Sequence, residues 1–76
     1  MIKTINRLRA RYPDKIESVS LEGPEDGYWL YLQPGWKREP NDEVHSVHEW
    51  NARDLIEGMR RIVPCDCAEC KSLMKK

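Results

Sequence analysis

The chain has 76 residues, of which 39% are apolar, so it can form one small hydrophobic core and no second domain. Thirteen Lys and Arg residues balance thirteen Asp and Glu residues, which argues against a general polyanion binder. Three Trp, three Tyr and regularly spaced aliphatic residues exclude a wholly disordered chain. A domain of this size often needs a metal, a disulfide or a partner to be stable.

The sequence carries no apolar stretch approaching the roughly 20 residues that span a bilayer. Its first residues also lack the apolar segment of a secretory signal. We therefore expect a cytoplasmic protein with no membrane partner. Thiols stay reduced in the cytoplasm, so cysteines there serve more readily as metal ligands than as a disulfide framework.

A helix is predicted over residues 1–12, because Ile2, Ile5, Leu8 and Tyr12 recur every three or four residues. Pro13 and Asp14 then end the helix. The other helix face is basic, and residues 1–15 carry five bases and one acid. A solvated helix face is the ordinary interpretation of such a pattern.

Residues 16–49 form the predicted sheet region, which is acidic, with eight acids against two bases. Alternating apolar residues predict a strand over 16–22, and the aromatic run 28–32 predicts its hairpin partner at the centre of the sheet. Residues 44–48 are either a third strand, with His45 and His48 on opposite faces, or a helical turn that puts both on one face.

A second helix is predicted over residues 51–63, with Asn51 as its N-cap and an apolar stripe behind it. Glycine lowers helix stability relative to alanine, so Gly58 inside this helix indicates either close packing at this position or a tolerated loss of stability. Residues 65–70 form a cysteine cluster and 71–76 a basic tail. Together these elements predict a single α+β domain over 1–76, with an N-terminal helix, two or three antiparallel strands, a C-terminal helix and a terminal zinc knuckle.

The strongest chemical signal is the C-x-C-x-x-C spacing of Cys65, Cys67 and Cys70. A Cys-x-x-Cys pair lets two thiolates reach one Zn²⁺ from a tight turn, and Cys65 can supply a third. A structural zinc takes four ligands, so we expect His45 or His48 to be the fourth. Free thiols, or a redox-active or intermolecular disulfide, are the alternatives to this zinc site.

A catalytic metal site built from His45, His48 and Glu49 is a further alternative, because two imidazoles and a carboxylate can hold a metal with an open position. Their H-x-x-H-E order differs from the H-E-x-x-H motif of zinc proteases. Phosphate-binding, dinucleotide-binding and serine-hydrolase motifs are also absent from the sequence. The sequence therefore predicts a protein that is not an enzyme.

Four aromatic residues are candidates for contact with a protein partner, because exposed Trp and Tyr dominate binding hot spots. They are Trp29, Tyr31, Trp36 and Trp50. If only one helical layer covers the sheet, the Trp29 and Tyr31 face stays open, whereas helices on both faces would bury it. The acidic loop over residues 39–43 would complete this contact surface.

A nucleic-acid-associated or regulatory protein is the second functional interpretation. Its basic surface would gather arginines from both helices together with the Lys-rich tail. The arginines are Arg7, Arg9, Arg11, Arg60 and Arg61. The acidic middle of the chain would repel phosphates from the aromatic residues, so a basic surface would have to lie elsewhere.

The segments G-Y-W (27–29), P-G (34–35), H-x-x-H-E (45–49) and C-D-C-x-x-C (65–70) together resemble a family of small uncharacterised bacteriophage and prophage proteins. The resemblance covers about residues 26–70 and implies no established activity. It implies an accessory protein that acts in the bacterial host cell by binding and redirecting a host protein, such as a defence or regulatory factor.

Overall fold

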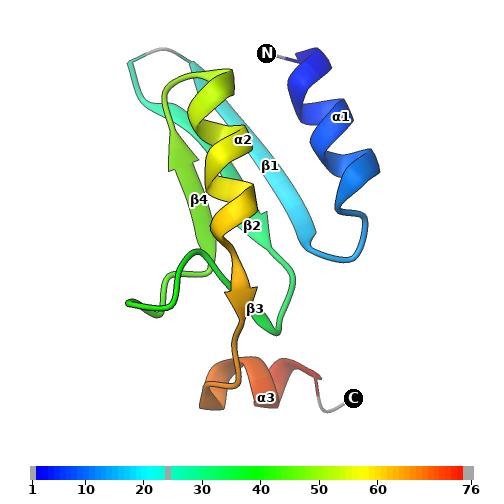
Figure 1. Cartoon of the computed structure of the whole chain (residues 1–76), viewed down its shortest axis with the longest axis vertical. Helices are drawn as coiled ribbons and strands as arrows, with labels where there is room; N and C mark the ends of the chain where they lie inside the picture. The colour runs from blue at the N-terminus through cyan, green and yellow to red at the C-terminus, as the bar shows by residue number, and fades with distance from the viewer. Residues whose placement is uncertain (1, 24, 75–76) are drawn as a thin grey trace.

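The computed structural model describes residues 2–23 and 25–74. The elements in chain order are α1 (Ile2–Arg11), β1 (Ile16–Gly23), β2 (Gly27–Leu32), β3 (Trp36–Lys37), β4 (Ser46–Glu49), α2 (Ala52–Arg61), β5 (Val63–Pro64) and α3 (Ala68–Met74). This arrangement confirms the predicted α+β class, with an N-terminal helix, an antiparallel sheet and a C-terminal helix (Figure 1).

The main sheet has the order β1-β2-β4, and both pairings are antiparallel. As predicted, the aromatic strand β2 is central. Residues 46–49 form a strand and not a helical turn, which resolves the alternative that the sequence left open. Val19, Leu30 and Val47 are aligned across the three strands. Because side chains alternate along a strand, this row lies on one face of the sheet and its neighbours on the other.

Both long helices cover the same face of the sheet. Ile5 and Leu8 of α1 and Leu55 and Met59 of α2 are buried in one cluster with Leu30 of β2. Leu30 and Leu55 are fully buried. Figure 1 shows α2 across the front of the sheet, with α1 beside it. The arrangement with one long helix on each face is therefore wrong, and α1 and α2 leave the opposite face of the sheet uncovered.

Strands β3 and β5 pair into a short two-stranded ribbon, which the sequence did not predict. The second helix ends at Arg61, two residues before the predicted end, and Ile62 is already extended (φ −60°, ψ 145°). Pro64 disfavours the helical conformation in Val63, the residue before it, so the helix cannot continue to residue 63. The freed residues Val63 and Pro64 pair with Lys37 and Trp36. This pairing brings the chain that follows back toward the sheet.

The two ends of the chain differ slightly from prediction. The first helix ends at Arg11, and the basic tail is helical as far as Met74, as part of α3. Residues 1 and 75–76 of the predicted helix and tail lie outside the described residues. Figure 1 shows α3 at the far end of the molecule from α1. No helix within residues 2–23 and 25–74 has the length and apolar character needed to cross a membrane.

Close contact between α2 and β4 explains Gly58. A Cβ atom at this position would lie 2.6 Å from Cγ1 of Val47. We expect Gly58→Ala to lower the free energy of unfolding by about 1 kcal/mol, because overpacking outweighs the gain of about 1 kcal/mol in helix propensity. Urea denaturation measures the change.

The control is the same substitution in a Val47→Ala background. Removing the obstructing methyl group should make Gly58→Ala neutral or stabilising there. A stabilising effect of Gly58→Ala with Val47 intact would contradict the proposed contact.

Candidate metal centre

Four potential metal ligands from two distant parts of the chain meet beside α3. His45 immediately precedes β4, Cys65 and Cys67 lie in the segment between β5 and α3, and Cys70 is in α3. One donor atom from each of the four residues lies within 4.8 Å of all the others. A metal ion bound to these atoms would join the main sheet to the C-terminal segment.

The backbone orients the His45 ring for metal binding. Its Nδ1 lies 2.9 Å from the carbonyl oxygen of Trp36, a distance at which a protonated Nδ1 donates a hydrogen bond. This leaves Nε2 as the ligand atom, and Nε2 lies 3.6 Å from Sγ of Cys67. Metal-ligating histidines commonly donate their other N–H to a carbonyl in this way. The separation matches the spacing of about 3.5 Å between nitrogen and sulfur ligands of a tetrahedral zinc.

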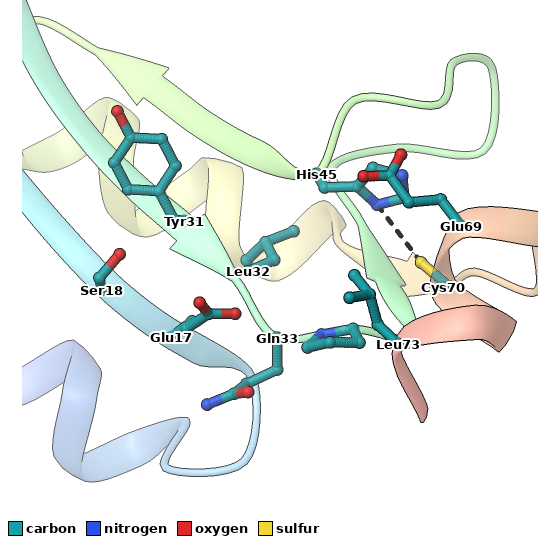
Figure 2. Close-up of a pocket in the computed structure, with 10 residues that line it drawn as sticks. Glu17, Ser18, Tyr31, Leu32, Gln33, His45, Glu69, Cys70 and Leu73 are labelled. Carbon is teal, nitrogen blue, oxygen red and sulfur yellow. Dashed lines mark hydrogen bonds between the residues drawn. The ribbon is translucent and has the colours of Figure 1, made fainter. Parts of the chain in front are cut away.

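The three cysteines are held by the backbone around them. The Cys65 N–H donates to the carbonyl oxygen of Gly35 (2.7 Å), so the β3–β5 ribbon positions this residue. The Cys70 N–H donates to Sγ of Cys67 (3.5 Å), and Cys70 Sγ lies 3.6 Å from His45 Nδ1, the contact drawn in Figure 2. Amide donors of this kind stabilise a thiolate, as a metal site requires.

The thiols differ strongly in acidity. The backbone amide of Cys70, followed by contacts with neighbouring thiols and His45, lowers the pKa of Cys67 to about 7. For Cys65, a backbone hydrogen bond from Cys67 favours the thiolate, but burial and the adjacent sulfur atoms outweigh it and raise the pKa to about 12. The hydrogen bond to Trp36 raises the pKa of His45. A bound cation would favour the thiolate form of all three cysteines, including Cys65, whose thiol is otherwise neutral.

The chemistry of the group fits a structural metal site. Cys65 and Cys70 are 5% and 2% exposed, and all three cysteines are free of disulfides in the structure. Thiolate and imidazole ligands suit a soft or borderline cation such as zinc. Three sulfur ligands and one nitrogen ligand complete a tetrahedral shell, which is typical of structural sites and leaves no position for a substrate.

His48, the other candidate for the fourth ligand, lies apart from this group. Its ring stacks on Trp29 with centroids 3.7 Å apart, and its Nε2 lies 2.8 Å from the Asp26 carbonyl oxygen. Because residues 46–49 are extended, His45 and His48 cannot share a face. Within residues 2–23 and 25–74, no second set of three His, Cys, Asp or Glu side chains lies close enough to hold an ion, so His45, His48 and Glu49 do not assemble a metal site.

The uncovered face of the main sheet carries a row of aromatic rings. Trp29 stacks on Tyr31 (6.1 Å, 8°) and on His48 (3.7 Å, 10°), and His48 contacts Trp50 (4.4 Å). We call Tyr31, Trp29, His48 and Trp50 the aromatic row. Three of the four predicted partner-binding aromatics are thus together, and His48 joins them. The register that aligns Trp29 with His48 is the signal that would have identified it.

Trp36, the fourth predicted partner-binding aromatic, is placed differently. It is half-buried against the hydrophobic core, and Nζ of Lys15 lies 4.6 Å from the centre of its ring. Its carbonyl oxygen orients His45. Trp36 therefore supports the metal centre, a role that its side-chain type could not have indicated.

The predicted acidic loop is largely neutralised by its own neighbours. Asp42 is bound by Arg38 (2.7 Å), and Glu43 lies 3.5 Å from Nζ of Lys37. The Asp42 carboxylate also accepts a hydrogen bond from the Val44 amide, the main reason that its pKa is lowered. This loop is a self-paired segment and contributes little free negative charge to a contact surface.

The predicted basic residues do not share one surface. Arg7, Arg11 and Arg60 line one groove between α1 and α2. Arg61 lines a different hollow beside Glu39 and Glu49, and Arg9 is exposed on α1 outside the groove. The structure thus brings together three of the five arginines.

A pocket of about 380 Å³ lies between the metal centre and the open face of the sheet (Figure 2). His45 and Cys70 form one side of it, and Tyr31 belongs to both the pocket and the aromatic row. Its lining includes the carboxylates of Glu17 and Glu69 but no Lys or Arg. The pocket is suited to a basic side chain.

Comparisons with protein-family models, curated protein sequences and solved structures found no match for this chain. The resemblance to bacteriophage and prophage proteins therefore stays a prediction.

Metal content tests the ligand set. We expect one zinc ion per chain in native mass spectrometry of the untagged protein. Replacing a ligand, in Cys67→Ser or His45→Ala, should weaken zinc binding about 100-fold or more, because a ligand of the tetrahedral shell is lost. His48→Ala is the matched control and should retain one zinc. Loss of zinc from the His48 variant alone would contradict the assignment.

Zinc affinity should fall as the pH is lowered through about 7. Below that pH the Cys67 thiolate becomes protonated, and protons on His45, whose pKa is raised, also compete with the metal. Calorimetric titrations in buffers of different ionisation enthalpy should show more protons released per zinc at pH 6 than at pH 8. Equal proton release at both pH values would be inconsistent with these acidities.

Proposed function

We propose that this protein is a non-enzymatic binding domain, stabilised by a structural zinc ion, that binds another protein through the uncovered face of its sheet. The observation that carries the proposal is the aromatic row on that face. The proposed partner is a host protein in a bacterial cell, as the resemblance to phage and prophage proteins implies.

The aromatic row has the composition of a binding hot spot. Trp50 is 54% exposed and Tyr31 is 40% exposed, although large aromatic side chains are usually mostly buried. Stacking holds the rings in place before any partner arrives. Rigid Trp and Tyr side chains lose little conformational entropy on binding, which favours affinity. An exposed surface of this kind is typical of a protein contact.

The charges around the row favour a protein partner over nucleic acid. The pocket that shares Tyr31 with the row is lined by Glu17 and Glu69 and by no Lys or Arg. A platform that stacks bases also needs cations to hold the phosphates. We therefore propose a partner with an apolar patch flanked by Lys or Arg, one of which would enter the pocket next to Tyr31.

Zinc supports this function by holding the pocket wall in place. His45 and Cys70 would both be ligands and also line the pocket, so the metal would fix the distance between β4 and α3. A domain this small gains much of its folding free energy from a bound metal. The metal would thus keep the contact surface rigid without touching the partner.

The test first captures binding proteins and then measures the affinity of each one after purification. The zinc-loaded protein is used to isolate binding proteins from nuclease-treated bacterial lysate, and the affinity of each purified candidate is then determined by calorimetry. We expect Trp50→Ala and Tyr31→Ala to weaken binding about 30-fold each, corresponding to about 2 kcal/mol for a hot-spot residue.

Ile2→Ala is the matched control, because this apolar residue is 65% exposed on α1 and distant from the aromatic row. It should leave the affinity unchanged. Equal binding by the wild type, Trp50→Ala and Tyr31→Ala would refute the proposed surface. Self-association through the aromatic row, detected by light scattering, would also refute it in favour of a dimer.

A further inference from the structure

The groove between α1 and α2 has an unusual lining. Arg7 and Arg11 extend from α1 and Arg60 from α2, while Leu8 and Ile56 supply apolar surface. Thr4 adds a hydroxyl group, and none of the six lining residues is acidic. The groove has a volume of about 220 Å³. It lies in the helical layer, on the other side of the sheet from the aromatic row.

The three arginine side chains are exposed and unpaired in the part of the chain that the structure describes. Within residues 2–23 and 25–74, no ion pair includes Arg7, Arg11 or Arg60. The Arg11 guanidinium lies 5.8 Å from the centre of the Tyr12 ring. Arg7 and Arg11 are four residues apart on one helix, a spacing at which like charges destabilise the helix. Together with Arg60 across the groove, they leave about three positive charges uncompensated.

We propose that this groove binds a phosphate group through Arg7, Arg11 and Arg60, with the Thr4 hydroxyl as an additional donor. Guanidinium groups bind phosphate through paired, charge-assisted hydrogen bonds, and an anion here would relieve the repulsion between Arg7 and Arg11. The groove is smaller than the roughly 300–1,000 Å³ of a drug-sized pocket, so it suits one phosphate group and not a whole nucleotide. The phosphate can come from free phosphate or from the backbone of a nucleic acid.

The experiment titrates the isotope-labelled 76-residue chain, as purified, with three probes at matched ionic strength. The probes are inorganic phosphate, a single-stranded oligonucleotide and a duplex of the same sequence, with sodium chloride as the reference. We expect the arginine side-chain NMR signals of Arg7, Arg11 and Arg60 to shift with phosphate. Arg7→Gln and Arg60→Gln should each weaken binding tenfold or more.

Arg9→Gln is the matched control, because Arg9 is an exposed arginine of α1 outside the groove. It should change the affinity less than twofold. If an oligonucleotide binds at least tenfold more tightly than inorganic phosphate, the phosphate source is a nucleic-acid backbone, and each groove substitution should reduce the salt slope by about one. Otherwise free phosphate is the source.

Two results would overturn the proposal. One is the absence of groove-specific shifts with any of the three probes. The other is an equal loss of binding in Arg9→Gln and Arg7→Gln, which would mean diffuse attraction to a basic helix. Neither result bears on the aromatic row, so the groove and the proposed partner surface are tested separately.

Discussion

The convergence of one imidazole and three thiols is the constraint on which the rest of this structure depends. His45 and Cys67 are separated by 22 residues, yet their side chains lie 3.6 Å apart. The chain between them includes β4, α2 and β5, so closing this loop fixes how the second helix returns to the sheet. Without a cation, burial and neighbouring sulfur atoms hold the Cys65 thiol in its neutral form. A metal would turn the same crowding into a source of stability.

The second organising feature is that the helices cover one face of the sheet only. This arrangement produces two surfaces of opposite character on opposite sides of the molecule. One side presents stacked aromatic rings on strands without Lys or Arg, and the other presents three arginines between two helices. The overall charge balance of the sequence does not reveal this groove, because a balanced total does not show where three arginines gather.

The candidate metal centre also shows how backbone geometry selects among candidate ligands. His45 and His48 are equivalent by residue type and by spacing from the cysteines. The Trp36 carbonyl oxygen holds one ring toward the sulfur atoms, whereas the Asp26 carbonyl oxygen and the Trp29 ring hold the other on the open face. The short ribbon of β3 and β5 makes this selection possible, because it places Trp36 beside the chain that leads to Cys65.

Local pattern in the sequence was sufficient for the α+β class, the two long helices, the β1–β2 hairpin and the cysteine cluster, since each depends on residues close together in the chain. Asn51 caps α2 as predicted, with its side chain accepting from the Asp54 amide. Tertiary structure alone decided that both helices share a face, that residues 63–64 pair with β3 and that Arg7, Arg11 and Arg60 meet. These outcomes depend on how the loops return the chain and on which apolar stripes pack together, and neither is encoded in the spacing of any one segment.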